Sequence, residues 1–174
     1  MSCKFALKQP NNKLGACTHD IPFGTMAEAT VTVDLSGKWK LDRNENFDEY
    51  MKSAGIGLIK RKLISSLPTT IEVTHTGDDF KFHTKTPLGS RLTTFTLGVV
   101  YPETNPMWGE SEHRVLANFD GGKLVQKVQN VQNALEGKPM RFERELVDGE
   151  LVLTMILGDM VAKRYFKKLE EATS

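Results

Sequence analysis

The sequence predicts an all-β domain of about ten short antiparallel strands, arranged as a barrel or a sandwich, with a pair of short helices near its start. Apolar and polar residues alternate with period two over most of the chain after Ser36, which is typical of strands with one buried face. Turn sequences such as Asp120–Gly122 and Asp148–Gly149 separate these segments at hairpin spacing. Apolar residues follow a helical spacing only between Asn46 and Pro68.

The first predicted elements are a strand and a helix. Residues 38–41 alternate, which predicts a strand that runs to about Asn44. Asn46 is suited to cap a helix, and Asp48 and Glu49 follow in the first turn, where acidic residues are favourable. The apolar side of this helix is predicted to consist of Phe47, Tyr50, Met51 and Ala54.

A second short helix is predicted after the break at residues 55–57, and Pro68 ends it. Its apolar side is predicted to carry Ile59, Leu63 and Leu67. Its basic residues are Lys60, Arg61 and Lys62. Such a cluster is commonly a solvated helix surface, and its functional interpretation is contact with an anionic membrane.

Nine further strands complete the predicted sheet, and turns separate them. Their expected ranges are 69–75, 80–86, 90–97, 99–101, 114–119, 123–129, 141–147, 151–157 and 160–168. This spacing favours hairpin connections, so consecutive strands are expected to pair with each other.

Two arginines lie on the predicted inner faces of the last strands. Arg144 alternates in phase with Met140, Phe142 and Leu146, and Arg164 alternates with Met160, Ala162 and Phe166. These faces carry no acid, and a buried guanidinium without an anion is unfavourable. Because guanidinium matches carboxylate well, we expect both arginines to hold the acid group of a ligand in an apolar cavity. The alternative is a structural ion pair with a carboxylate from another strand.

Composition excludes several classes of protein. The chain has 174 residues, which suggests one domain, and its net charge of +1 gives no electrostatic case for binding nucleic acid. No run approaches the roughly 18 apolar residues of a membrane span, and the start lacks the apolar core of a secretory signal. Cys3 and Cys17 have no metal-site spacing and form no disulfide framework. We therefore expect a cytoplasmic protein without cofactor or metal.

Catalytic motifs are nearly absent from the sequence, so we do not expect an enzyme. His75 and His83 flank a turn and could face each other, but no third ligand or catalytic partner is evident. We interpret them as solvated histidines on strands.

The ordered motifs resemble those of the intracellular lipid-binding proteins, and most closely the heart, adipocyte and brain fatty-acid-binding proteins. The matching segments are Gly37–Leu41, Asn46–Met51, Pro68–Thr70, Asp120–Val125, Arg144–Gly149 and the late Arg164. The resemblance covers about residues 34–170. It implies a ten-stranded antiparallel up-and-down barrel of the calycin, or lipocalin-like, type, with a helix-turn-helix lid and one fatty acid inside.

The resemblance also implies a site for the ligand's carboxylate. In the family, two arginines and a tyrosine in the pattern Arg-x-Tyr hold this group, and Arg144 and Arg164 match the arginines. Phe166 occupies the tyrosine position, so the hydroxyl is missing, and water or a threonine such as Thr84 is a candidate to replace it. Two arginines favour an acid over an alcohol, because the retinol-binding branch typically has glutamines at these positions.

The positions that match the family's cavity wall give a set of expected lining residues. These are Phe47, Tyr50, Met51, Ile56, Pro68, Thr70, Thr84, Leu88, Phe142, Leu153 and Met155. Leu88 is expected at the portal between two strands. Lys52, Arg61 and Lys62 match positions that form a nuclear import signal in some members of the family.

The chain departs from the family pattern in three places. Residues 1–33 are predicted to form a flexible extension before the lipid-binding domain of residues 34–174. A small insertion is expected around residues 106–109, and a longer loop at 129–138 replaces a short turn.

Together these features predict a monomeric intracellular carrier of long-chain fatty acids, which contacts anionic membranes transiently and enters the nucleus if the import signal operates. One alternative is a carrier of retinoic acid or another amphipathic acid. The other is an interaction protein that uses the barrel as a scaffold.

Overall fold

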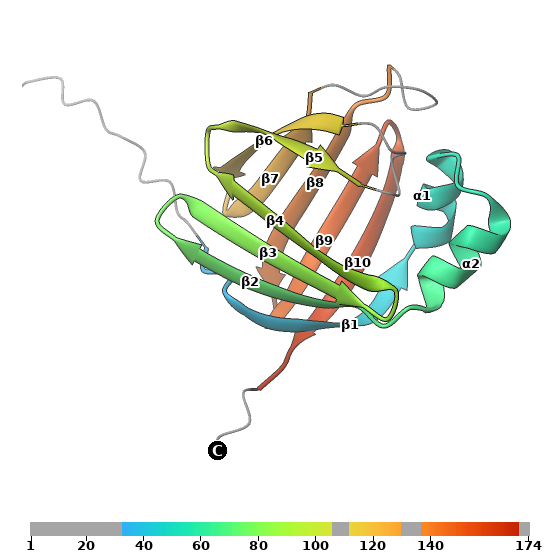
Figure 1. The fold of residues 1–174 in the computed structure, drawn as a ribbon, viewed down its shortest axis with the longest axis horizontal. Coiled ribbons are helices and arrows are strands. Elements are labelled where there is room, and N and C mark those ends of the chain that lie inside the picture. Colours follow the sequence, from blue (N-terminus) through green and yellow to red (C-terminus); the bar gives the residue numbers. More distant parts are fainter. Residues whose placement is uncertain (1–32, 106–111, 130–136, 171–174) are drawn as a thin grey trace, which may run out of the picture.

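A computed structural model describes residues 33–105, 112–129 and 137–170. Its ten strands form one antiparallel sheet that curls into a nearly closed barrel, as predicted (Figure 1). The strands are β1 (Gly37–Glu45), β2 (Thr70–Thr76), β3 (Asp79–Thr86), β4 (Gly89–Thr96), β5 (Val100–Thr104), β6 (Glu112–Asp120), β7 (Lys123–Val128), β8 (Met140–Val147), β9 (Glu150–Leu157) and β10 (Met160–Lys168).

The sheet is an up-and-down meander that closes through its first and last strands. The strand order is β4-β3-β2-β1-β10-β9-β8-β7-β6-β5, so β1 pairs with both β2 and β10. β4 and β5 stand at the two ends of this order, and within the described strands no ladder of backbone hydrogen bonds joins them. The barrel therefore has one seam, between β4 and β5.

Tight turns set the strand register as the sequence predicted. Between β8 and β9, Asp148 and Gly149 both have positive φ, 51° and 81°. Two successive residues of positive φ match the right-handed twist of hairpin strands. A glycine avoids the steric penalty of that conformation, which explains its place in this turn.

At the end of the barrel away from the helices, the core consists largely of aromatic side chains. Phe80 stacks on Phe95 with ring centroids 5.4 Å apart, and Phe95 stacks on Tyr101 at 5.0 Å. Phe95 belongs to β4 and Tyr101 to β5, so this stack packs across the seam. Trp39 is 2% exposed, and its Nε1 donates to the carbonyl of the fully buried Leu35 at 3.0 Å.

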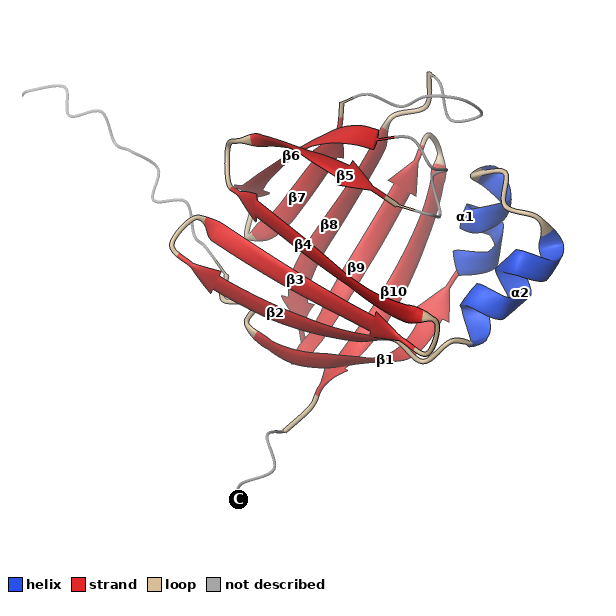
Figure 2. Cartoon of the chain, viewed as in Figure 1, coloured by secondary structure: helices blue, strands red, loops and turns tan. Residues whose placement is uncertain are grey.

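Two helices cover the opposite end of the barrel and form the lid (Figure 2). They are α1 (Phe47–Ser53) and α2 (Leu58–Ser66). α1 buries Phe47, Tyr50 and Met51 and packs on β10 and β9, as its apolar stripe predicted. Asn46 occupies the N-cap position of α1 as predicted, in a left-handed conformation, but the described structure gives its side chain no capping hydrogen bond. Its amide reaches the carbonyl of Val161 at 3.5 Å instead.

The predicted apolar side of α2 is wrong at Ile59 and Leu63, whereas Leu67 is half-buried as predicted. Ile59 and Leu63 are 88% and 48% exposed, whereas Ile64 is the residue that packs against the core. α2 has no fully buried residue among its nine, because it lies over the open end of the barrel rather than on a sheet face. Helical spacing allowed either face, and tertiary packing selected the one with Ile64.

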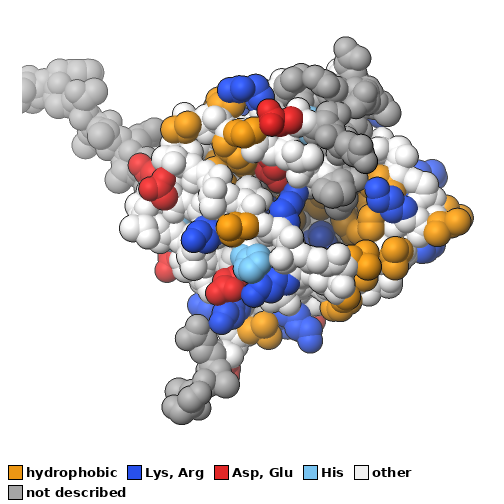
Figure 3. Space-filling view, in the orientation of Figure 1, with side chains coloured by type: hydrophobic (Ala, Val, Ile, Leu, Met, Phe, Trp, Pro, Cys, Tyr) orange, Lys and Arg blue, Asp and Glu red, His pale blue; other side chains and the backbone are white. Residues whose placement is uncertain are grey.

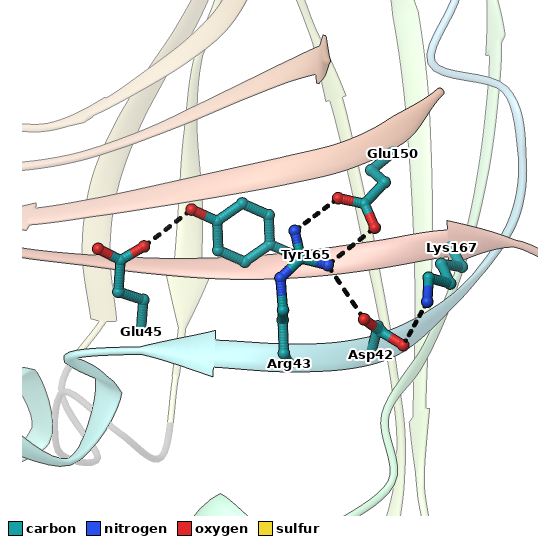
Figure 4. Close-up of polar contacts among 6 residues, drawn as sticks. All are labelled: Asp42, Arg43, Glu45, Glu150, Tyr165 and Lys167. Carbon is teal, nitrogen blue, oxygen red and sulfur yellow. Dashed lines mark hydrogen bonds and ion pairs between the residues drawn. The ribbon is translucent and has the colours of Figure 1, made fainter. Parts of the chain in front are cut away.

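β1 contains a bulge at Asp42, where its pairing with β10 shifts by one residue. Around the bulge a polar cluster forms on the outer face of β1, β9 and β10 (Figure 4). Arg43 makes two hydrogen bonds to Glu150, at 2.8 and 2.7 Å, and lies over the Tyr165 ring at 4.0 Å. The Tyr165 hydroxyl donates to Glu45 at 2.8 Å, so Tyr165 faces outward as predicted.

The two histidines do not face each other. In the β2–β3 ladder, His75 lies opposite Phe80 and His83 lies opposite Glu72. His75 Nε2 contacts the Asp34 carboxylate at 2.9 Å, a partner that the sequence did not suggest. The described residues contain no cluster of three or more potential metal ligands.

Three sequence predictions fall on residues that the structure does not describe. They are the extension of residues 1–33, apart from Val33, the insertion at 106–109 and most of the loop at 129–138. Neither described helix has the length and hydropathy needed to span a membrane.

Candidate functional site

A cavity of about 450 Å³ lies between the barrel wall and α2. Figure 3 shows the surface hollowed beside the helices, with hydrophobic and basic side chains within the hollow. Its apolar wall includes Ile64, Leu67, Ile71, Leu88, Phe142, Leu153 and Met155. Its polar and charged members include Thr69, Thr84, Arg91, Glu103, Gln126, Arg144 and Arg164. An apolar wall with a few polar groups is typical of a site for a small amphipathic molecule.

Arg144 reaches this cavity from β8. Its guanidinium lies 4.7 Å from the centroid of the Phe82 ring, and its Nη1 donates to Oε1 of Gln126. Burial lowers the pKa of Arg144 to about 10, because the charged form loses solvation. The group still carries its charge at neutral pH, in surroundings that disfavour that charge.

Arg164 reaches the same cavity from β10. Its Nε donates to Oδ1 of Asn44 at 3.0 Å, and its Nη2 donates to Oγ1 of Thr69 at 3.3 Å. The guanidinium also lies over the Phe47 ring at 4.5 Å. Burial lowers the pKa of Arg164 to about 10 as well. Both cavity arginines are therefore held by neutral partners.

Among the described residues, no carboxylate forms an ion pair with Arg144 or Arg164. The contacts found for their guanidinium groups are the amides, hydroxyl and aromatic rings given above. An acid does lie on the cavity wall, Glu103, but its ion pair is with Arg91 at 3.3 Å. Glu103 belongs to β5, a strand other than the two that carry Arg144 and Arg164, and the sequence did not identify it as a cavity residue. The alternative of a direct ion pair within the core finds no support at either arginine.

The structure places the predicted lining residues in three groups. On the cavity wall lie Thr84, Leu88, Phe142, Leu153 and Met155. In the core outside the cavity lie Phe47, Tyr50, Met51 and Ile56, because α1 uses its apolar face to pack on the sheet. Pro68 is exposed at the end of α2.

Thr70 is predicted one residue out of phase. It pairs with Lys40 and Lys85, so its side chain shares their outer face of the sheet. Thr69 and Ile71 line the cavity in its place. Side chains alternate along a strand, so an error of one position moves a residue to the opposite face.

Phe166 faces inward as the alternation predicted, but it lies in the packed core. Its side chain is 0% exposed, and its ring centroid is 5.6 Å from the Arg164 guanidinium. The ring is not part of the cavity wall described above. Phe166 thus lies beside Arg164, but its side chain does not line the cavity.

Sequence reasoning missed several polar residues of the site. Gln126 and Arg91 lie in phase with the inner faces of β7 and β4, and alternation could have found them. Asn44 could not be found this way, because the bulge at Asp42 changes the phase of β1 and brings Asn44 opposite Arg164.

The basic side chains of the lid differ in their exposure to solvent. Arg61 is only 12% exposed and binds the Ile56 carbonyl at 2.9 Å and Asp48 at 3.4 Å, so it ties α2 to α1. Lys52 and Lys62 are 63% and 71% exposed, with long contacts to acids of α1. Lys60 lines the cavity. Lys60 is exposed as well, so Arg61 is the least exposed member of this basic group.

Comparisons with known proteins agree with the geometry. Residues 36–164 match the model of the lipocalin / cytosolic fatty-acid binding protein family. The intestinal fatty acid-binding protein of Sus scrofa is 35% identical over 134 residues, which cover 77% of this chain and 98% of that protein. Sodium/calcium exchanger regulatory protein 1 of Doryteuthis pealeii is 28% identical over 141 residues, which cover 80% of this chain and all of that protein. A solved fatty acid-binding protein from brain tissue of Drosophila melanogaster is 36% identical, with a TM-score of 0.64 over 75% of this chain and 95% of that one.

Proposed function

The chain belongs to the lipocalin / cytosolic fatty-acid binding protein family, and from this premise we propose that it is an intracellular carrier of long-chain fatty acids. The family is one of lipid-binding proteins rather than enzymes. The ligand's tail lies in the cavity under the lid, and Arg144 and Arg164 hold its carboxylate. The correspondence to the heart, adipocyte and brain members remains a prediction.

One observation carries this proposal: two half-buried arginines line an apolar cavity without an acid partner among the described residues. Each has neutral hydrogen-bond partners, so a bound carboxylate would supply the missing negative charge. Neutral partners hold each guanidinium in a fixed orientation without cancelling its charge. The site therefore favours an acid over an alcohol or an ester.

Two alternatives share parts of this evidence. Retinoic acid or another amphipathic acid would use the same arginines, and only the shape of the tail separates it from a fatty acid. The relative from Doryteuthis pealeii is named as a regulator of a sodium/calcium exchanger, which supports a second candidate function, a protein interaction with the barrel as scaffold. Binding measurements with free acids distinguish these from the main proposal.

We further propose that the protein works as a cytoplasmic monomer and delivers its ligand by transient contact between lid and anionic membranes. α2 exposes Leu58, Ile59 and Leu63 beside Lys62, and Figure 3 shows hydrophobic side chains gathered over the helices. Apolar and basic groups together are typical of surfaces that touch anionic bilayers. Nuclear entry through Lys52, Arg61 and Lys62 is the second part of this proposal, although Arg61 is mostly buried.

The test replaces each cavity arginine by alanine and measures binding of oleate and of methyl oleate by calorimetry. Hydrogen bonds to charged groups contribute about 1.5–3 kcal/mol, so each variant should bind oleate roughly tenfold more weakly or worse. The methyl ester should change much less, because it has no charge to lose. Arg43→Ala is the matched control, since Arg43 is 49% exposed on the outer face. Unchanged oleate affinity in a folded Arg144→Ala/Arg164→Ala double variant would refute the assignment.

A further inference from the structure

The seam between β4 and β5 is spanned by charged side chains that also face the cavity. Arg91 of β4 reaches across to β5, where its Nη1 lies 3.3 Å from Oε1 of Glu103 and 3.4 Å from the carbonyl oxygen of Thr104. Both Arg91 and Glu103 line the same cavity as Arg144 and Arg164. The Glu103 side chain is 10% exposed and that of Arg91 is 39% exposed.

Arg91 and Glu103 stand at the end of a series of hydrogen-bonded side chains that begins at Arg144. Arg144 donates to Gln126, and Nε2 of Gln126 donates to the Tyr101 hydroxyl at 2.5 Å. The Tyr101 hydroxyl then donates to Oε2 of Glu103 at 3.4 Å. The chain crosses the wall from β8 through β7 to β5, and Arg91 continues it to β4. Four members of this chain, Arg144, Gln126, Glu103 and Arg91, line the cavity, and Tyr101 connects them from outside it.

The contacts at the seam leave capacity for a further partner. The usual donor–acceptor distance is about 2.7–3.2 Å for N–H···O bonds and shorter for O–H···O bonds. The contacts that reach Glu103 are 3.3 and 3.4 Å, and that from Arg91 to Thr104 is 3.4 Å. A carboxylate can accept about four hydrogen bonds and a guanidinium can donate five. Glu103 and Arg91 could thus accept and donate more bonds than these residues supply.

We propose that Arg91 and Glu103 form a second polar subsite that recognises a hydroxyl group on the ligand's tail. This inference rests on the proposed function and specifies its ligand class, long-chain fatty acids with a hydroxyl along the chain. The hydroxyl donates its hydrogen to the Glu103 carboxylate, and its oxygen accepts from the Arg91 guanidinium. The carboxylate of the same ligand lies at Arg144 and Arg164.

A plain hydrocarbon tail suits this part of the wall poorly. It would remove water from two charged groups and return no hydrogen bond to them, which is unfavourable. A hydroxyl supplies both missing roles, since it donates one bond and accepts others. Sites built to hydrogen-bond a hydroxyl discriminate strongly against analogues that lack it. With Arg91 and Glu103 in its wall, the cavity should bind fatty acids that carry a hydroxyl on the chain more tightly than those that do not.

The test uses octadecanoic acid and a series of its derivatives that carry a single hydroxyl, moved stepwise from the carbon next to the carboxylate to the far end. Competition against a fluorescent fatty acid gives the affinity of each for the unmodified protein. At least one position within the chain should bind about tenfold more tightly than the parent acid, as expected for hydrogen bonds to charged groups. Derivatives whose hydroxyl lies away from the pair should show no such gain.

Two variants assign the preference to the seam. Glu103→Gln should reduce the ratio between the favoured hydroxy acid and the parent acid to near one, and Arg91→Gln should reduce it in the same direction. The matched control is Glu150→Gln, which removes a carboxylate that pairs with an arginine on the outer face (Figure 4). It should keep the full ratio. Thermal unfolding of each variant verifies that the barrel is intact.

The outcomes separate this inference from the function on which it rests. If the parent acid binds through Arg144 and Arg164 but no hydroxylated derivative is preferred, the seam proposal is wrong and the carrier proposal stands. A preference that survives in both Glu103→Gln and Arg91→Gln also refutes it. If none of the acids binds, the proposed function fails and this inference fails with it.

Discussion

At Phe166, the addition of a single hydroxyl group can test whether Arg164 holds a ligand's carboxylate. The family pattern has a tyrosine at this position, and here the ring is fully buried with its centroid 5.6 Å from the Arg164 guanidinium. Although the Phe166 ring itself does not line the cavity, we expect a hydroxyl added to it to approach Arg164 and a carboxylate held there. The added group would otherwise be buried without a partner.

We predict that Phe166→Tyr tightens the binding of a fatty acid by about 1 kcal/mol, the contribution of a typical hydrogen bond. Calorimetry with oleate and methyl oleate measures the effect, and the gain should be confined to the acid. Phe80→Tyr is the control, because Phe80 is also buried but stacks in the aromatic core at the other end. A lower affinity for oleate in Phe166→Tyr would show that the new hydroxyl does not reach the carboxylate.

At this scale the sequence predicted the two arginines but not their surroundings. Alternation placed Arg144 and Arg164 inside, and the structure confirms that both line the cavity. Their partners come from other strands and from the segment between α2 and β2, as Gln126 and Thr69 illustrate. Such partnerships depend on how strands far apart in the chain are aligned, which local patterns do not specify.

The lid exposes several large apolar side chains to solvent. In α2, Leu58, Ile59 and Leu63 are 59%, 88% and 48% exposed. The exposed lysines Lys52 and Lys62 lie on the same helix pair. A membrane would cover these apolar side chains and attract the lysines, each with about 1 kcal/mol near an anionic surface.

We predict that Lys52→Gln/Lys62→Gln slows the transfer of a fluorescent fatty acid to anionic vesicles several-fold. Arg61 stays unchanged, because it holds α2 to α1 through Asp48 and the Ile56 carbonyl. Equilibrium affinity should stay the same, since neither lysine belongs to the cavity wall. The control is Lys38→Gln/Lys85→Gln, which removes two ion-paired lysines on the outer sheet face. Transfer rates that depend on neither vesicle charge nor the lid lysines would contradict membrane contact through this element.

The elements themselves were predictable to different degrees. All ten strands were predicted, because alternation and turn residues are properties of the local sequence. The orientation of α2 was not, since both of its faces carry apolar residues and only the barrel opening selects between them. The bulge at Asp42 was not predicted either, because nothing in the composition of β1 distinguishes its extra residue.

At the scale of the whole molecule, the described barrel begins with a short segment that is tied into the core. Leu35 is fully buried and its carbonyl accepts from Trp39. Asp34 accepts from the backbone N–H of Ser36 at 2.8 Å, which lowers the pKa of Asp34 to about 2. Asp34 also contacts His75 of β2. The sequence predicted a domain boundary at residue 34 because regular alternation begins near that point. These contacts depend on tertiary structure, so the sequence pattern did not indicate them.

We predict that two shortened chains will behave differently. A chain that begins at Val33 should keep the melting temperature and oleate affinity of the full chain, because all ten strands and the arginines lie beyond that point. A chain that begins at Gly37 loses Leu35, whose burial contributes about 1.5–3 kcal/mol, and one hydrogen bond of about 1 kcal/mol. Chemical denaturation should show this loss as a lower midpoint at an unchanged slope. Equal stability of the two shortened chains would mean that residues 33–36 add nothing to the barrel. A marked loss in the chain that begins at Val33 would instead assign a stabilising role to residues 1–32.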